Sequence, residues 1–405
     1  MELFEGELLN FSHLDSAKIS SPTEEEINQK YIKGDVRIIT EQARYPLSGI
    51  VGMVEGDSYE LNPEFQRRHR WDTRKKSRLI ESFIMNVPIP PIFLYEDSYS
   101  HYQVMDGLQR LTAIYGFYKD LYILEGLEEW SELNGLYYSQ LPEQVRRGID
   151  RRYLSSVILL QETAKDLREA QRLKQLVFER INSGGIKLEE QESRNAIYNG
   201  PLNKLCIKLS RNQYLCRMWG IPEPDAKEIQ TEIVSDSVLQ NERYRRMEDV
   251  ELVLRFLAYR QRLNHPKGSL EAYLNSYLQY GNSFPEALLN KMEDLFLRTI
   301  KLVYEVFDKN AFLLWRSRQS AGADKEQWGW FDRPSYTVYE PMMYAFSQFI
   351  DTADKIIARK DTLNEQIKKF YKENYDSFGG KNTTNISKLE DRNKLFMDFI
   401  LSVIS

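Results

Sequence analysis

The pattern of apolar and polar positions changes twice along the 405 residues of the chain. Residues 1–45 are polar and weakly periodic, so we expect a leader segment with one short helix. Further on, short apolar runs alternate with Pro and Gly, which is typical of strands joined by turns. After about residue 165, apolar positions recur at three- and four-residue steps, which predicts helices. The sequence therefore predicts an α+β domain over residues 46–205 and an all-α helical domain over residues 206–405.

Individual elements of the α+β domain follow from the same pattern. Strands are expected at LSGIVGMV, PIFLY, HYQVM and YLSSVILLQET, which cover residues 47–54, 91–95, 101–105 and 153–163. The polar stretch between the second and third of these suits a hairpin turn. Two amphipathic helices are expected, one in RKKSRLIESFIMN with Leu79, Ile80 and Phe83 on one face, and one directly after Asp106 and Gly107.

Long helical stripes dominate the second half of the chain. Helical periodicity is present in DLREAQRLKQLVFERIN, RMEDVELVLRFLAYRQR and ALLNKMEDLFLRTIKLVYEVF. In the last of these, one stripe holds Leu288, Met292, Leu295, Phe296, Ile300, Val303 and Phe307. These stripes predict a packed helical core.

Composition and charge limit the classes of function. The chain is 42% hydrophobic and 28% charged, which is ordinary for a folded protein. Its net charge of -5 excludes a globally basic nucleic-acid coat, so any contact with DNA or nucleotide requires a local basic patch. No secretory signal or membrane-length apolar run is present, and the two cysteines provide no disulfide framework, so we expect a cytoplasmic protein with no membrane partner.

A local basic patch occurs in NPEFQRRHRWDTRKKSR, residues 62–78, where seven Arg and Lys side chains face two acidic ones. Arginine matches phosphate oxygens in a bidentate manner, and Trp71 offers a face for stacking. We expect Arg68, Arg74 and Lys75 to contact DNA. The alternative is a solvated helix start whose charges pair with acidic neighbours.

A second cluster lies at the strand-to-helix turn of YQVMDGLQRLTAIYGFY. Gly107 permits a close approach of backbone to ligand, and the following helical turn can accept an anion. Asp106 could hold a divalent metal, Gln109 could orient a water, and Arg110 could neutralise a phosphate. In the alternative, Asp106 caps the helix and pairs with Arg110 at i,i+4.

A third cluster lies in FERINSGGIKLEEQESRNAIYNGP, which predicts two helices joined by a Ser-Gly-Gly loop. Its polar side chains favour a buried hydrogen-bond network that fixes the helix pair. Within it, Asn182 and Arg194 are the residues we expect to face a ligand.

Together, the motifs PEFQRRHRWD, PPIFLYED, YQVMDGLQRLTAI and FERINSGGIKLEEQESRNAIYNG resemble one family over residues 55–205. That family is the ParB/sulfiredoxin-like N-terminal domain of GmrSD-type restriction endonucleases, which also occurs in phosphorothioate-sensing nucleases. The resemblance implies a ParB/sulfiredoxin-like fold, NTP as ligand or substrate, Mg2+ as cofactor, and DNA, modified or foreign, as target. It places the protein in prokaryotic anti-phage defence.

The resemblance also assigns roles to residues. The family's acid-glycine-glutamine-glutamine-arginine motif of nucleotide hydrolysis is matched by DGLQR, which makes Asp106, Gln109 and Arg110 catalytic and Asp106 the metal ligand. Leu108 replaces the first glutamine, and its side chain cannot hydrogen-bond. Residues expected at the nucleotide and its phosphates are Arg67, Arg70, Gly107, Asn182 and Arg194.

Many larger relatives carry an HNH nuclease, which needs histidines for its metal and general base. This chain has four, His13, His69, His101 and His265, and none forms a histidine-asparagine pair near the C-terminus. We therefore expect a nuclease partner subunit. Two alternatives stay open: a metal-dependent nuclease within this domain that uses Asp106 and Glu64, and a non-enzymatic DNA-binding or scaffold protein.

Overall fold

The chain forms two compact units, each described here by itself. The first comprises Lys18–Ile197, and the second comprises Met1–Ala17 with Tyr198–Ser405. The structure is a computed structural model that describes residues 3–9, 23–33, 38–61, 71–160, 167–182, 189–231, 234–265, 268–318, 327–379 and 385–404. The boundary therefore falls at Ile197 rather than at the predicted residue 205. The first residues of the predicted leader belong to the helical unit.

A five-stranded mixed sheet forms the centre of the first unit, in the order β1-β5-β3-β4-β2. Its strands are β1 (Thr40–Pro46), β2 (Tyr59–Glu60), β3 (Ile92–Ser98), β4 (His101–Asp106) and β5 (Tyr153–Leu159). The β3 and β4 strands form an antiparallel hairpin, and β3 pairs with β5 in parallel. Three of the four predicted strands are confirmed.

The fourth predicted strand, LSGIVGMV, is wrong. This segment forms a 3-10 turn at Leu47–Gly49 followed by helix α2 (Ile50–Glu55). Ile50 and Met53 are both buried, and their i,i+3 spacing places them on one face of a helix. A short apolar run that lies on a core can adopt either structure, so its length alone did not decide between them.

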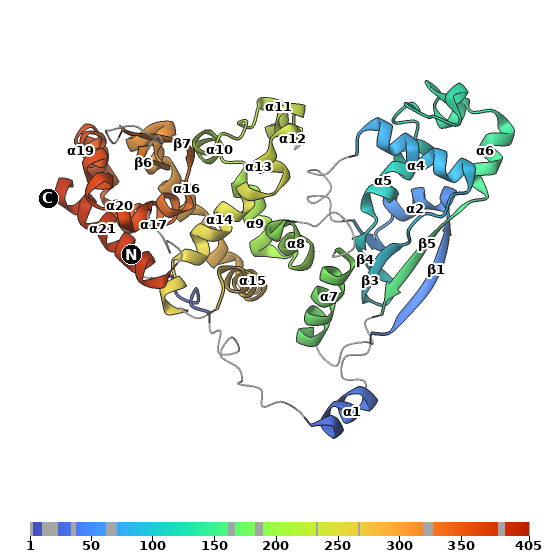
Figure 1. Cartoon of the computed structure of the whole chain (residues 1–405), viewed down its shortest axis with the longest axis horizontal. Helices are drawn as coiled ribbons and strands as arrows, with labels where there is room; N and C mark the ends of the chain where they lie inside the picture. The colour runs from blue at the N-terminus through green and yellow to red at the C-terminus, as the bar shows by residue number, and fades with distance from the viewer. Residues whose placement is uncertain are drawn as a thin grey trace. The chain divides into compact units, whose positions relative to one another are not determined.

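Helices cover both faces of this sheet (Figure 1). The unit contains α1 (Glu24–Lys33), α2, α4 (Thr73–Met85), α5 (Leu108–Tyr118), α6 (Glu143–Asp150), α7 (Leu167–Asn182) and α8 (Glu190–Ile197). The buried Ile92 and Leu94 of β3 face the core that α2, α4 and α5 share. Tyr95, the next residue of β3, points to the opposite face, where Lys174 of α7 lies over its ring.

The second unit is mainly helical. Its helices are α9 (Pro201–Ser210), α10 (Gln213–Trp219), α11 (Ala226–Thr231), α12 (Asp236–Gln240), α13 (Glu242–Arg245), α14 (Glu248–Tyr259), α15 (Leu270–Gly281), α16 (Glu286–Phe307), α17 (Tyr336–Gln348), α18 (Ala353–Ala358), α19 (Lys360–Glu373), α20 (Tyr375–Phe378) and α21 (Ile386–Ile404). The predicted stripe of α16 is buried along its whole length. The unit also contains a hairpin of β6 (Leu313–Arg318) and β7 (Gln327–Pro334), which helical periodicity did not predict.

The start of the chain is fixed to this helical unit by a buried ion pair. Glu7 is fully buried, and its carboxylate accepts from Nε and Nη2 of Arg260 at 2.7 and 2.9 Å. Among the helices described, none combines the length and apolar character needed to cross a lipid bilayer. Both cysteines, Cys206 and Cys216, are buried free thiols.

Candidate functional site

The junction of β4 and α5 is a tight strand-to-helix turn centred on Gly107. Asp106 is the last residue of β4, and Gly107 is the N-cap residue of α5 with a φ of 95°. A Cβ at this position would lie 2.3 Å from Cγ2 of Ile92, which is fully buried in β3. Both the positive φ and the close packing require glycine here.

The first turn of α5 exposes backbone donors at this junction. The N–H groups of Arg110 and Leu111 donate to the Gly107 carbonyl, at 3.0 Å each. Within the described part of the chain, the N–H groups of Leu108 and Gln109 have no hydrogen-bond acceptor. Unpaired N–H groups at a helix N-terminus attract anions, and phosphate oxygens in particular. The Leu108 side chain is buried and takes no part in this surface.

Asp106 and Arg110 form an ion pair across the turn. Oδ2 of Asp106 lies 2.8 Å from Nη2 of Arg110, which also donates to the Pro91 carbonyl at 3.3 Å. The Arg110 side chain is only 15% exposed, whereas the Asp106 side chain is 40% exposed. This is the i,i+4 pairing considered above, but Asp106 is not the N-cap residue. Nε of Arg110 is buried and has no hydrogen-bond partner among the described residues.

The basic segment reaches the same turn through Trp71. Its backbone N–H donates to Oε1 of Gln109 at 3.1 Å, and its indole packs against the core of the unit. The Lys75 ammonium lies 5.0 Å from the Trp71 ring centroid. Asp72 is the N-cap residue of α4 and accepts from the Lys75 N–H at 2.7 Å. The turn and the start of α4 are therefore joined directly.

Five of the predicted residues lie wholly or partly outside the described part of the chain. Arg67, Arg68, Arg70 and Glu64 lie outside the described residues. Asn182 ends α7, and its side chain is likewise outside the described part.

The remaining predicted ligand residue, Arg194, is buried in α8. Its Nη1 donates to Oε1 of Gln191 at 2.7 Å, and its Nη2 lies 3.2 Å from Oε2 of Glu190. Gln191 and Glu190 belong to the same helix as Arg194. These contacts fit the buried hydrogen-bond network that the sequence favoured for this segment.

A second polar cluster, on the other face of the sheet, was missed by the sequence analysis. Nε2 of Gln103 donates to Glu60 at 2.8 Å and to Asp97 at 3.0 Å, and its Oε1 accepts from Lys174 Nζ. His101 contacts the same Asp97 at 2.6 Å. Only the polar alternation of His101 and Gln103 along β4 could have indicated it, because Lys174 is distant in sequence.

This cluster has a measurable pH signature. Burial lowers the pKa of Lys174 to about 8, although the carboxylates of Glu60 and Asp97 oppose the shift. Because the unfolded chain then binds more protons than the folded chain above pH 8, stability rises with pH in that range.

Relative to Lys174→Met, we expect the free energy of unfolding of the wild type to rise by about 2 kcal/mol between pH 8 and 10. Urea unfolding at several pH values measures this difference. Lys75→Met, at an exposed position, should show no such change.

No group of three or more His, Cys, Asp or Glu side chains that could hold a metal occurs among the described residues. Asp106 supplies one carboxylate at this turn. Such a site suits Mg2+ only when phosphate oxygens complete the coordination, as they do for Mg-nucleotides.

Comparison with known proteins places this turn in a family. Residues 50–199 match the model of the GmrSD restriction endonuclease, N-terminal domain, and this range contains β2 to β5 and the whole Gly107 turn. No curated protein matched the chain, and no solved structure did.

Proposed function

Residues 50–199 belong to the GmrSD restriction endonuclease N-terminal domain family, and from this premise we propose that the chain is a nucleotide-hydrolysing, DNA-directed component of a prokaryotic restriction system. The nucleoside triphosphate binds at the Gly107 turn. The observation that carries this proposal is the pair of N–H groups of Leu108 and Gln109, which have no acceptor among the described residues and are flanked by Asp106 and Arg110. Backbone N–H donors and the Arg110 guanidinium suit phosphate oxygens, and the Asp106 carboxylate suits the Mg2+ ion of a Mg-triphosphate.

Each residue of the turn has a role in this proposal. Arg110 neutralises phosphate charge, and its largely buried side chain is already fixed by the Pro91 carbonyl. Asp106 supplies one oxygen ligand to the Mg2+ ion, which when bound would stabilise charge on the phosphate oxygens. Gln109, held by the Trp71 N–H, orients the attacking water. Hydrolysis adds this water to the γ-phosphorus and breaks the bond to the β-γ bridging oxygen. The products are the nucleoside diphosphate, inorganic phosphate and a proton.

Leu108 separates this turn from the family motif, in which a glutamine occupies the same place. Because its side chain is 6% exposed and packs in the core, it contributes only its backbone N–H to the ligand. Binding through the backbone is retained, and catalysis depends on the remaining glutamine, Gln109.

The exposed side of α4 is the surface we propose for DNA. The side chains of Arg74 and Arg78 are 67% and 59% exposed, and Lys75 is exposed beside them. Arg74 lies 3.9 Å from Glu125, and Arg78 lies 2.6 Å from Glu128, so Lys75 and Arg74 are the less strongly held cations. Such side chains contact phosphates and give affinity without sequence specificity.

The double variant Arg74→Gln/Lys75→Gln is expected to weaken DNA binding without changing nucleotide turnover in the absence of DNA. Each lost phosphate contact lowers the slope of log affinity against log salt by about 0.9. Fluorescence anisotropy with a labelled duplex at several salt concentrations measures that slope. Arg147→Gln, at an exposed position on α6, is the matched control. An unchanged slope in the double variant would show that Arg74 and Lys75 of α4 do not contact DNA.

Phosphate release by the purified full chain tests the proposed activity. The assay compares ATP, GTP, CTP and UTP with Mg2+, each with and without DNA. Release from at least one nucleotide, increased by DNA, is the expected result. Plasmid nicking that needs metal but no nucleotide would instead favour a metal-dependent nuclease, and salt-sensitive DNA binding without any phosphate release would favour a scaffold.

A further inference from the structure

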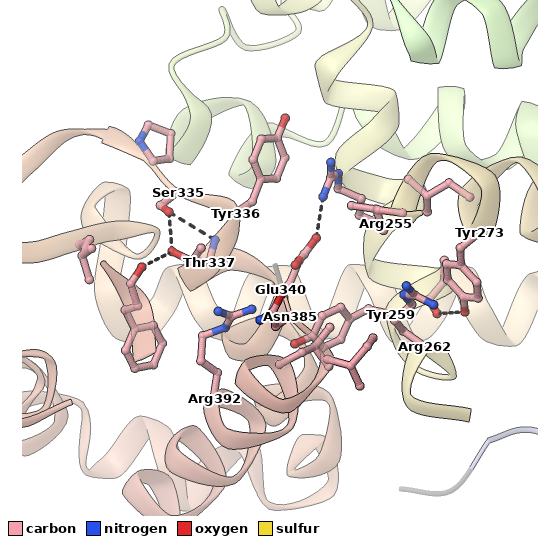
Figure 2. Close-up of a pocket in the computed structure, with 18 of the residues that line it drawn as sticks. Arg255, Tyr259, Arg262, Tyr273, Ser335, Tyr336, Thr337, Glu340, Asn385 and Arg392 are labelled. Carbon is pink, nitrogen blue, oxygen red and sulfur yellow. Dashed lines mark hydrogen bonds and ion pairs between the residues drawn. The ribbon is translucent and has the colours of Figure 1, made fainter. Parts of the chain in front are cut away.

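A cavity of about 960 Å³ lies within the helical unit, apart from the Gly107 turn in sequence and unit. Its walls are formed by α14, α15, α17 and α21 together with the β6-β7 hairpin. Pockets of about 300–1,000 Å³ are the usual size for small-molecule ligands. Figure 2 shows arginine and tyrosine side chains from several of these helices around it.

Positive charge dominates the polar groups that line the cavity. They include four arginines, Arg255, Arg262, Arg316 and Arg392, and one carboxylate, Glu340. That carboxylate is already engaged: its Oε1 lies 2.8 Å from Nη1 of Arg255, which also contacts Glu251 at 2.8 Å through Nε (Figure 2). Arg255 is therefore neutralised by two glutamates, and among the described residues Glu340 is the one acidic side chain that lines the cavity.

Arg262 is a buried cation that forms no ion pair with any described carboxylate. Its side chain donates to the carbonyls of His265 and Gly268 and lies over the ring of Tyr273, 4.7 Å from the centroid. Only 6% of the residue is exposed, and no carboxylate of the described residues lies within ion-pair distance of it. Burial lowers the pKa of this guanidinium, although Tyr273 and the more distant carboxylate of Glu340 oppose the shift. Buried charges in proteins are normally paired.

Arg316, which is partly exposed, is a second arginine of the cavity that forms no ion pair with any described carboxylate. Its guanidinium lies 3.6 Å from the centroid of the Phe331 ring, and its buried Nε has no hydrogen-bond partner among the described residues. No carboxylate of the described chain forms an ion pair with it. Two arginines of one cavity thus lack an ion-pair partner among the described residues, and a bound anion would offset their charge.

We propose that this cavity binds a nucleotide, whose phosphate offsets Arg262 and Arg316 and whose base lies against the aromatic wall. Guanidinium groups bind phosphate with two parallel hydrogen bonds, which suits this anion. The wall contains the rings of Tyr259, Tyr336 and Phe331, with Arg255 and Arg316 over the last two, and bases stack on guanidinium planes as well as on aromatic rings. This site is independent of the Gly107 turn and would let a second nucleotide act on the helical unit.

Isothermal titration of the full chain with nucleoside monophosphates, with inorganic phosphate and with unphosphorylated nucleosides tests this site. At least one monophosphate is expected to bind more tightly than its nucleoside. In Arg316→Gln, its affinity should fall about ten- to one-hundred-fold, the usual effect of removing one charged hydrogen-bond partner. Arg298→Gln, at an exposed arginine of α16 in the same unit, is the matched control and should bind as the wild type does.

Two further measurements separate this site from misfolding and from the Gly107 turn. Ligand-free Arg316→Gln should have an unfolding temperature at or above that of the wild type, because an uncompensated charge has been removed. Asp106→Asn should leave the monophosphate affinity unchanged. The proposal is overturned if no monophosphate binds, if Arg316→Gln binds as the control does, or if affinity follows Asp106 instead.

Discussion

Gly107→Ala is expected to destabilise the first unit by about 2–5 kcal/mol and to abolish nucleotide binding. The new Cβ adopts a left-handed conformation at a φ of 95°, which costs about 1–2 kcal/mol. It also lies 2.3 Å from Cγ2 of Ile92, and this methyl group cannot move because its residue is fully buried. Urea unfolding followed by circular dichroism measures the loss.

Gly135→Ala separates the two contributions. Gly135 belongs to the same unit and has a φ of 87°, but a Cβ there would meet no atom within 4 Å. This control therefore retains the backbone strain and removes the steric conflict. If both variants lose equal stability, the close packing of Gly107 on Ile92 is not what requires glycine at the turn.

Asp106→Asn is expected to reduce NTP turnover about one-hundred-fold or more, the usual effect of removing one electrostatic contact from a catalytic site. Asparagine keeps an oxygen that can accept from Arg110, so the turn should retain its structure. Binding of the triphosphate should weaken less than turnover, since Leu108 and Gln109 still present their N–H groups. The assay is steady-state phosphate release, with circular dichroism as a check on folding.

Asp57→Asn provides the matched control for this variant. Asp57 is an exposed carboxylate of the same unit, away from the Gly107 turn in sequence. It should leave turnover at the wild-type rate. Equal turnover in Asp106→Asn and Asp57→Asn would exclude Asp106 from catalysis.

The elements with long or strongly alternating patterns were predictable from sequence. The stripe from Leu288 to Phe307 is one buried face of α16, and the apolar runs PIFLY and HYQVM form a hairpin. The Asp106 and Arg110 pair matches the alternative considered for this turn, although Asp106 lies at the end of β4 and not in α5. In each case the information lies within a few residues of the chain.

Contacts between distant segments were not predictable in this way. The Trp71 N–H donates to Gln109, which is 38 residues away in sequence, and Lys174 donates to Gln103, which is 71 residues away. Both hydrogen bonds depend on how the strands and helices pack in the folded unit. The β6-β7 hairpin depends on the cross-strand packing of Trp315 on Trp330, whose ring centroids are 5.3 Å apart. The prediction of a strand at residues 47–54 was wrong for a different reason. The helix there, α2, is too short for the spacing of its apolar residues to distinguish a helix from a strand.

Hydrogen exchange at the backbone amides of Leu108 and Gln109 tests the central claim most directly. Both N–H groups lack an acceptor among the described residues, so they should exchange rapidly in the free protein. Addition of a Mg-triphosphate should protect both amides at short labelling times, and should protect neither in Gly107→Ala. A triphosphate that binds the wild type while these two amides exchange as fast as before would contradict a phosphate site at this turn.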